Sequence, residues 1–127
     1  MEFPSDRRYT VDHLWLRTEG NVATIGITDF AQDQLGEVLL LELPATGAQL
    51  QSGETFGLVE SAKVSVELEA PASGEVIERN GALEDSPWTL NDSPYEEGWL
   101  LRVRLESEGE PDGLLDVETY RKQCEEA

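Results

Sequence analysis

The stretch GETFGLVESAKVSVELEAPASGEVIERN, residues 53–80, holds three of the β-strands that the sequence predicts. We expect them over residues 55–61, 64–70 and 74–79. In the second strand the apolar residues at positions 64, 66 and 68 alternate with polar residues, so one face of this strand is expected to be buried. Pro71 ends the strand because proline cannot donate a ladder hydrogen bond. Lys63 therefore falls in the turn between two strands.

The tripeptide Ser-Gly-Glu occurs on both sides of this turn, at residues 52–54 and again at 73–75. Lys63 lies ten residues after Gly53 and eleven residues before Gly74. Two interpretations are open. Either two similar β-units are related by an approximate two-fold, with Lys63 at their connection, or a common turn tripeptide recurs by chance.

Outside this stretch, further strands and short helices alternate with turns. Glu19-Gly20-Asn21 separates two β-rich runs, which predicts a hairpin. Asp29 is expected to cap a helix that Gly36 ends. The expected elements are a polar lead over 1–10, strands over 14–18, 22–27, 37–43 and 98–105, a helix over 29–36, a short helix around 83–90, a polar linker over 106–112 and a final helix around 114–124.

Short strands with frequent turns predict a mainly β fold, a sandwich or barrel to which helices are added. A chain of 127 residues is expected to form a single domain, residues 1–127. We expect its core over about residues 9–105 and its C-terminal helix over about residues 112–125.

Acidic residues outnumber basic residues by 27 to 9, which gives a formal net charge of −18. A protein that binds duplex nucleic acid needs a basic surface to neutralise phosphates, so this class is excluded. An anionic membrane surface would repel the chain for the same reason. The longest apolar run, Val38–Leu41, is far shorter than the ~20 residues of a membrane span. We expect neither nucleic acid nor a membrane as a partner.

The residue types that usually carry catalysis are scarce and scattered. The one histidine, His13, and the one cysteine, Cys124, lie at opposite ends of the chain. The sequence has no cysteine–histidine cluster for zinc, no glycine-rich phosphate motif and no distinctive pair of carboxylates. It therefore predicts no catalytic residues, no metal site and no self-contained enzyme. A lone cysteine and an amino terminus without a signal sequence favour the cytoplasm.

Lys63 is a candidate modification site. Seven of the nine basic residues are Arg, and only Lys63 and Lys122 are Lys. Arginine provides a fixed charge, whereas the amine of lysine can be acylated. The turn Ser61-Ala62-Lys63 also lacks the Gly, Asn, Asp and Pro that hairpin turns favour. The alternative is a solvated lysine without a role.

These residues resemble a known family. ESAK, within residues 53–80, is similar to the lipoyl-lysine segment of the glycine cleavage system H protein family. The similarity extends over roughly residues 9–122. It is carried by YTVDHLWL (9–16), VATIGITDFAQDQLGEVLLLELP (22–44), LNDSPYEEGWLLRV (90–103) and the terminal helix around Leu114–Tyr120.

The resemblance implies a barrel-sandwich hybrid of two antiparallel sheets, of the lipoyl- and biotinyl-carrier type, with short helices and a C-terminal helix. It implies a monomeric, non-catalytic carrier in which lipoic acid, amide-linked to Lys63, acts as a swinging arm. Glu60, Ser61 and Ala62 would shape the turn that a lipoate–protein ligase or lipoyltransferase recognises. The other implied partners are a pyridoxal-phosphate glycine decarboxylase, an aminomethyltransferase and dihydrolipoamide dehydrogenase.

Three positions in the expected arm cleft differ from the family pattern. Leu14 stands where the family has Glu, Phe30 where it often has His or Tyr, and Glu67 where it often has Asp. Leu14 cannot pair with the ammonium of an aminomethyl cargo, so protection of that cargo should weaken unless a carboxylate such as Glu67 takes over. The simpler alternative is that Leu14 packs in the core.

Two cargoes therefore stay open for a carrier of this kind. One is the aminomethyl group of glycine cleavage. The other is a sulfur intermediate, carried beside heterodisulfide-reductase-like enzymes of bacterial sulfur oxidation, which needs no carboxylate at position 14. An unmodified binding module on the same fold is a third interpretation. A biotinyl carrier is disfavoured, because Ala62 and Val64 flank the lysine where such carriers usually have methionines.

Overall fold

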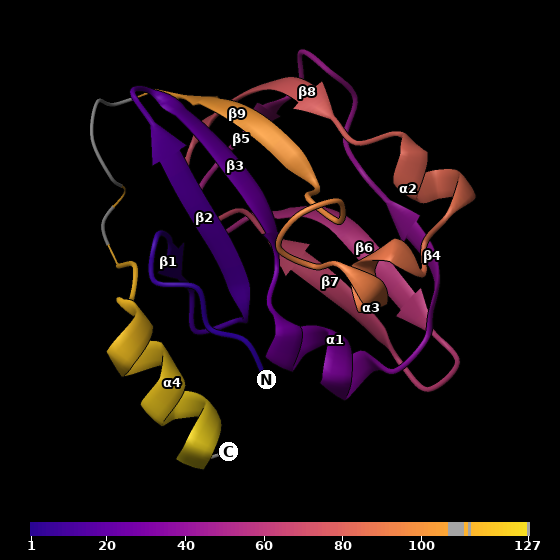
Figure 1. Ribbon diagram of the computed structural model, residues 1–127. Coiled ribbons are helices and arrows are strands. Elements are labelled where there is room, and N and C mark those ends of the chain that lie inside the picture. Colours follow the sequence, from indigo (N-terminus) through magenta and orange to yellow (C-terminus); the bar gives the residue numbers. More distant parts are fainter. Residues whose placement is uncertain (107–110, 112, 127) are drawn as a thin grey trace.

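The computed structural model describes residues 1–106, 111 and 113–126, and it contains two antiparallel sheets with short helices (Figure 1). The larger sheet has the order β1 (Arg8–Tyr9), β2 (Leu14–Glu19), β3 (Val22–Ile27), β9 (Leu101–Leu105), β8 (Gly74–Arg79) and β5 (Gln49–Leu50). The smaller sheet has the order β4 (Val38–Glu42), β6 (Thr55–Ser61) and β7 (Ser65–Glu69). The helices are α1 (Asp29–Leu35), α2 (Ala82–Asp85), α3 (Thr89–Asp92) and α4 (Val117–Glu126).

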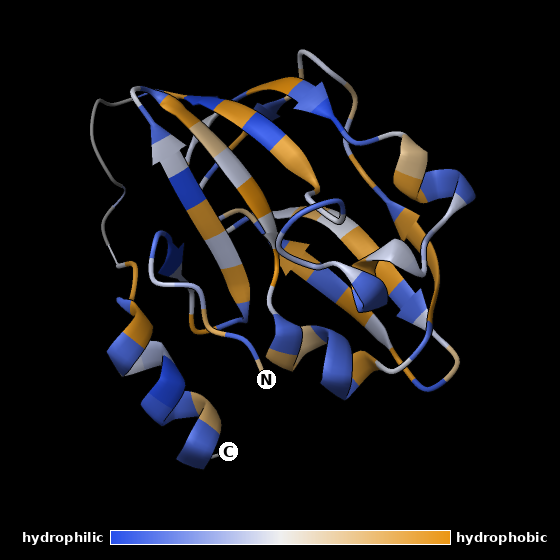
Figure 2. Ribbon diagram, viewed as in Figure 1, coloured by the Kyte–Doolittle hydropathy of each residue, from blue (hydrophilic) through white to orange (hydrophobic). Residues whose placement is uncertain are grey.

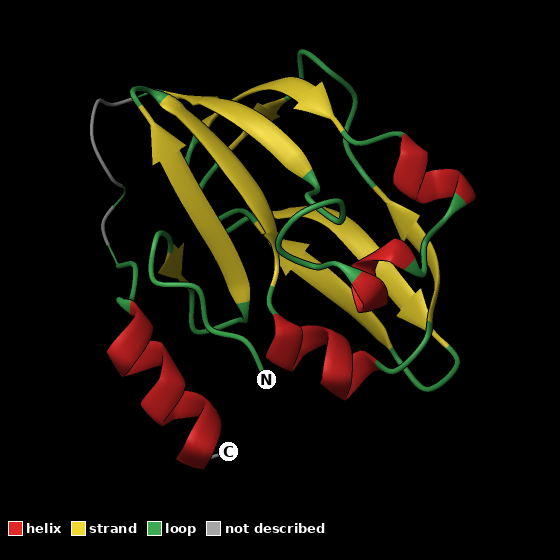
Figure 3. Ribbon diagram, viewed as in Figure 1, coloured by secondary structure: helices red, strands yellow, loops and turns green. Residues whose placement is uncertain are grey.

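This arrangement confirms the prediction of a mainly β fold with two antiparallel sheets, short helices and a C-terminal helix (Figure 3). The predicted strands over 55–61 and 74–79 have the observed bounds. Among the described residues, no helix combines the length and the apolar character needed to cross a membrane.

The core lies between the two sheets. Val59 of the smaller sheet and Ile25, Val76 and Val103 of the larger sheet are completely buried in one apolar cluster. Apolar and polar residues alternate along strands such as β9, as expected when one face of a strand is buried (Figure 2). The buried face predicted for residues 64–70 is present only at Leu68, because Val64 and Val66 are exposed like Glu67 and Glu69.

A second, aromatic cluster connects the larger sheet to α4. Its buried members are Tyr9, Trp15, Tyr95 and Tyr120. The rings of Tyr9 and Tyr120 stack with their centroids 4.6 Å apart, and the indole N–H of Trp15 donates to the carbonyl oxygen of Pro94 at 2.9 Å. The segment predicted as a polar lead therefore contributes Tyr9, a fully buried residue, to this cluster.

The cap of α1 differs from the prediction. Thr28, and not Asp29, is the capping residue, since its hydroxyl oxygen accepts a hydrogen bond from the N–H of Ala31 at 3.1 Å. Asp29 is instead the first residue of the helix, and its carboxylate accepts from the side chain of Gln32 at 2.7 Å. Gly36 ends the helix as predicted, with a φ of +73° that favours glycine.

The chain between β8 and β9 forms two short helices, α2 and α3, where the sequence predicts one. Pro87 lies between them and, lacking an N–H, cannot continue a helical hydrogen-bond ladder. The last strand begins at Leu101 and not at Gly98, because the N–H of Gly98 closes a turn onto the carbonyl oxygen of Ser93 at 2.7 Å.

The final helix begins at Val117, later than predicted. Leu115, just before it, exchanges backbone hydrogen bonds with Tyr9 at 2.7 and 2.9 Å, which ties this segment to β1. Residues 107–110 and 112, most of the predicted linker, lie outside the described residues. The strands β1 and β5 have two residues each and are too short to show a hydrophobic period.

The two Ser-Gly-Glu tripeptides lie beside each other. The N–H of Ser52 donates to the hydroxyl oxygen of Ser73 at 3.0 Å, and the N–H of Gly53 donates to the carbonyl oxygen of Ala70 at 2.9 Å. Both contacts lie at the end of the β6–β7 hairpin that is remote from Lys63. An approximate two-fold relation between two β-units stays a prediction.

Candidate functional site

Lys63 lies at the tip of the hairpin formed by β6 and β7. The last paired residues before the tip are Glu60 and Ser65, so residues 61–64 form the turn. Lys63 and Ala62 are exposed there. The two strands pair along their length, apart from a register shift near Thr55, and this pairing holds the turn out from the sheets (Figure 1). The lysine is thus presented to solvent on a supported backbone.

The Ser61 side chain organises the turn. Its hydroxyl accepts hydrogen bonds from the backbone N–H groups of Lys63 and Val64, both at 3.2 Å, and donates to the carbonyl oxygen of Val64, also at 3.2 Å. The backbone N–H of Ser61 donates to the same carbonyl oxygen at 2.9 Å. A serine hydroxyl can replace the backbone contacts of a tight turn, which explains how this turn forms without Gly, Asn, Asp or Pro.

The stem of the Lys63 side chain lies against the end of α1. A Cβ added at Gly36 would be 3.1 Å from Cε of Lys63 and 3.6 Å from its Nζ. Asn91 of α3 holds this end of α1 in place, because its side-chain amide donates to the carbonyl oxygen of Gly36 at 2.7 Å. The Oδ1 of Asn91 accepts from the N–H of Val38 at 2.9 Å. The surface under the lysine is therefore fixed by α1, α3 and β4 together.

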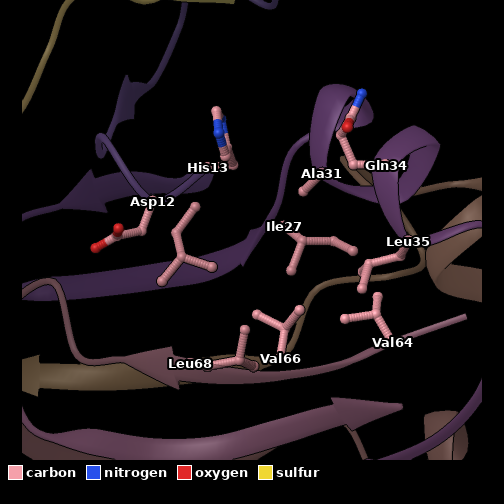
Figure 4. A pocket seen from close by; sticks show the side chains of 10 residues that line it. Asp12, His13, Ile27, Ala31, Gln34, Leu35, Val64, Val66 and Leu68 are labelled. Carbon is pink, nitrogen blue, oxygen red and sulfur yellow. The ribbon is translucent and has the colours of Figure 1, made fainter. Parts of the chain in front are cut away.

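A mostly apolar pocket of about 130 Å³ opens beside the hairpin (Figure 4). Its apolar lining comes from the hairpin, α1, β2 and β3, as Val64, Val66, Leu68, Ala31, Leu35, Leu14 and Ile27. In Figure 4 the labelled apolar side chains point toward one another, whereas the carboxylate of Asp12 points away from them. Val64 and Val66 are more than a third exposed, at 43% and 38%, so the pocket is open on the side of the lysine-bearing hairpin.

The three residues predicted to line the arm cleft, Leu14, Phe30 and Glu67, have different surroundings in the structure. Leu14 lines the apolar pocket and is 2% exposed. Phe30 packs its ring on His13 with the centroids 4.6 Å apart. The carboxylate of Glu67 accepts from the hydroxyl of Thr55 at 3.4 Å. Glu67 also borders a second hollow of about 290 Å³, which it shares with Leu14.

His13 forms part of the pocket wall and is linked to α4. Its Nδ1 lies 2.8 Å from the hydroxyl of Tyr120, which is 2.7 Å from the hydroxyl of Thr28, the cap of α1. One arrangement satisfies all three groups: Thr28 donates to Tyr120, and Tyr120 donates to the neutral imidazole. Burial lowers the pKa of His13, which favours that neutral form.

Sequence reasoning missed the contributions of His13, Asn91 and Gly36 to this site. His13 has a φ of +69°, unusual for a residue other than glycine, but no sequence pattern predicts that conformation. The contact of Gly36 with Lys63 joins residues 27 positions apart, so only the tertiary structure shows it. Within the described residues, no group of three or more His, Cys, Asp or Glu side chains could hold a metal ion.

The fold and the site together define a class of small two-sheet domains that present a lysine at a hairpin tip. A family model described as glycine cleavage H-protein matches residues 7–127. The glycine cleavage system H protein of Rubrobacter xylanophilus is 53% identical over 125 residues, which cover 98% of this chain and 97% of the relative. That of Brevibacillus brevis is 49% identical over 126 residues, which cover 99% and 100% of the two chains.

The comparison with a solved structure also shows similarity to this family. The crystal structure of a glycine cleavage system H protein from Mycobacterium marinum matches this fold with a TM-score of 0.87 at 38% identity, and the match covers 94% of this chain and 97% of that one. The chain therefore belongs to the glycine cleavage H-protein family, and the resemblance found in the sequence is confirmed.

Proposed function

We propose that this protein is a non-catalytic lipoyl carrier of the glycine cleavage system, with lipoic acid joined by an amide to Lys63. The observation that carries the proposal is the exposed Lys63 amine at the tip of a supported hairpin, beside an apolar pocket. Membership of the H-protein family supports it. We place the protein in the cytoplasm and propose that it acts as a monomer.

The residues around Lys63 fit such a group. The amine is exposed and can be acylated, and the pocket of about 130 Å³ approaches the ~150 Å³ of an apolar cavity known to hold benzene. Leu14, Leu35 and Val66 would contact the hydrocarbon chain or the small dithiolane ring when the arm folds back. When attached, the dithiolane supplies the redox and group-carrying chemistry, which is a property of the cofactor.

The turn residues have separate tasks in this proposal. Ser61 holds the backbone of the tip through its three hydrogen bonds. Ala62 is exposed and small, which leaves the approach to Lys63 open. Glu60 adds a charge at the last strand pair. These residues would be recognised by a lipoate–protein ligase or a lipoyltransferase.

The partners follow from this role. A pyridoxal-phosphate glycine decarboxylase would load the arm, an aminomethyltransferase would unload it, and dihydrolipoamide dehydrogenase would reoxidise it. Tethering makes each transfer effectively intramolecular, so a local concentration replaces free diffusion. The net charge of −18 would favour encounters with basic surfaces of these enzymes, and added salt would weaken them.

The cargo depends on the lining of the pocket. Leu14 is buried among apolar side chains, while Glu67 lies opposite Leu58 on the hairpin and does not line this pocket. A charged ammonium would gain little from such a pocket, because burying a charge without a partner is unfavourable. Glycine cleavage is the function that the family supports, and weak protection of the aminomethyl cargo is the expected consequence of Leu14. A sulfur cargo stays the alternative prediction, which Leu14 favours.

Loading with glycine distinguishes the two cargoes. Lipoylated protein is incubated with glycine and glycine decarboxylase, and the attached aminomethyl group is followed by intact mass, with another H protein as the positive control. We expect loading, and a longer lifetime of the loaded form in Leu14→Glu than in the wild type or in the uncharged control Leu14→Gln. No loading, when the positive control loads, would reject glycine cleavage and favour the sulfur cargo.

A further inference from the structure

We propose that the outward face of the smaller sheet is the docking surface for the enzyme that attaches the arm to Lys63, a partner that presents a basic side chain beside an apolar one. We call it the Leu40 face, and it consists of Leu39, Leu40, Glu42, Leu58, Glu60 and Glu67. This inference rests on the proposed lipoylation of Lys63. It goes beyond the turn residues to a surface on the neighbouring strands.

Two consecutive leucines are exposed on this face. A regular strand buries every second residue, but the register of β4 against β6 shifts between Val38 and Leu40. As a result Leu39 is 54% exposed and Leu40 is 48% exposed, while Val38 and Leu41 on either side are buried. The core gains nothing from these two exposed side chains. Adjacent exposed apolar residues of this kind are typical of interaction sites.

The carboxylates of this face differ from those of strand β8 in the larger sheet. On the larger sheet Glu75 and Glu78 pair with Arg104 and Arg102 across the strands. In the part of the chain that the structure describes, no ion pair involves Glu42, Glu60 or Glu67. The strands β4, β6 and β7 contain no Arg or Lys. The Leu40 face therefore has an unbalanced negative charge.

The arrangement of the charges fits one basic side chain. Glu42 lies opposite Leu58 on β6, and Leu58 lies opposite Glu67 on β7, so the leucine is between the two carboxylates. All three residues border a hollow of about 410 Å³. An Arg or Lys of the partner could lay its aliphatic stem on Leu58 and place its charge between the carboxylates. This charge complementarity identifies a basic protein surface as the occupant.

The position of the face relative to Lys63 identifies which partner covers it. Leu40 lies opposite Glu60 in the next strand, about 5 Å away, and Glu60 precedes Lys63 by three residues, which span at most about 10 Å. A standard interface buries about 800 Å² on each partner, a patch of about 16 Å radius. An enzyme that places its active site over Lys63 therefore reaches the Leu40 face in an interface of ordinary size.

Competition measures this docking without the chemistry of attachment. Lys63→Arg cannot form the amide, so its purified chain is used as an inhibitor of wild-type lipoylation by a lipoate–protein ligase. Leu39→Thr with Leu40→Thr is then added to that chain. Threonine suits a strand and removes most of the apolar surface. We expect the inhibition constant to rise about tenfold, whereas the control Val11→Thr, at another exposed apolar position, leaves it unchanged.

Charge is tested with Glu42→Gln and Glu67→Gln in the same inhibitor. We expect weaker inhibition at low salt and a smaller effect of added salt, because two charges that attract the partner are removed. The matched control is Glu19→Gln with Glu96→Gln, which removes two exposed carboxylates elsewhere on the molecule. It is expected to behave like the parent chain. Thermal unfolding confirms that each variant is folded.

The outcomes separate this proposal from the proposed function. If the wild-type chain is lipoylated and all inhibitors have equal inhibition constants, the docking surface is wrong and the carrier role stands. If the wild-type chain is not lipoylated, both fail. The double variant Glu42→Gln, Glu67→Gln could instead inhibit as well as its control. That result would show that the partner does not place a basic side chain between these two carboxylates. If the leucine variant and the glutamate variant both inhibit more weakly than the parent chain, the apolar and the basic parts of the proposal are both supported.

Discussion

Gly36 is the residue against which the Lys63 side chain lies. Its φ of +73° is strained for any other residue, and a Cβ there would approach Cε of Lys63 to 3.1 Å. Gly36→Ala should therefore lower the free energy of unfolding by about 1–2 kcal/mol from backbone strain, and should also displace the lysine stem. Urea unfolding measures the first effect, and the Lys63 side-chain resonances in NMR spectra measure the second.

The matched control for this substitution is Gly20→Ala. Gly20 also has a positive φ, +62°, but open space around its Cβ position. It should show the strain without any change at Lys63. Identical Lys63 spectra in the two variants would show that the contact with Gly36 does not position the lysine.

At the scale of residues, the sequence predicts single positions better than their contacts. Lys63 could be identified because it is one of two lysines and lies in an unusual turn, and Gly36 could be predicted as a helix end. The contact between them could not, because it depends on how α1 packs beside the hairpin. In the same way, Leu14 could be noticed as a departure from the family, but only the fold shows that it lines an apolar pocket.

The helix α4 is held to the rest of the fold by Tyr120. The ring is fully buried and stacks on Tyr9, and its hydroxyl contacts both His13 and Thr28. Tyr120→Phe keeps the stacking and leaves the buried Thr28 hydroxyl and the half-buried His13 imidazole without this partner. We expect a loss of about 1–3 kcal/mol in the free energy of unfolding and faster amide hydrogen exchange along α4.

Tyr95→Phe is the comparison for this effect. The Tyr95 hydroxyl accepts from the N–H of Asp29 at 3.0 Å and donates to the carbonyl oxygen of Glu2 at 2.8 Å, away from α4. Its loss should affect the amino terminus and α1, while hydrogen exchange in α4 stays unchanged. Equal protection of α4 in the wild type and Tyr120→Phe would mean that the hydroxyl does not hold this helix.

At the scale of elements, long periodic strands could be predicted and short elements could not. The strand over 64–70 shows an alternation in the sequence, and both hairpin strands, predicted over 55–61 and 64–70, are present with the same or nearly the same bounds. The strands β1 and β5 form through backbone pairing with β2 and β8, respectively. The sequence predicts Asp29 as the cap of α1, but Thr28 is the cap. Adjacent Thr and Asp are both good capping residues, so only the backbone geometry decides between them.

Stability should depend on pH through His13. Burial lowers the pKa of His13 below its ordinary value of 6.5. As pH falls below 6.5, the unfolded chain binds a proton that the folded chain resists, so the free energy of unfolding decreases. His13→Asn tolerates the positive φ of this position and should flatten this dependence between pH 6.5 and the lower folded pKa. A slope as steep as that of the wild type would contradict it.

A second pH effect lies at lower pH. The hydrogen bond from Arg7 holds the pKa of Asp6 below its ordinary value of 3.8. The stability from this pair is present above 3.8 and is lost as pH falls through the folded pKa. The two effects can therefore be separated by their pH ranges in urea unfolding curves.

At the scale of the whole molecule, the sequence predicts the amount of charge and not its location. The net charge of −18 excludes nucleic acid and suggests basic partners. Only the fold shows that the carboxylates Glu75 and Glu78 are paired with arginines on the larger sheet, whereas among the described residues Glu42 and Glu67 on the smaller sheet form no ion pair. The sheet whose hairpin carries Lys63 therefore has carboxylates but no basic residue in its own strands.

The central claim is that Lys63 carries a lipoyl group, and intact mass tests it most directly. The chain is co-expressed with a lipoate–protein ligase in medium that contains lipoic acid, and modified peptides are then sequenced. We expect a gain equal to one lipoyl group, located on Lys63 and absent from Lys63→Arg, while Lys122→Arg is modified like the wild type. An unmodified wild-type mass, or a gain that persists in Lys63→Arg, would contradict it.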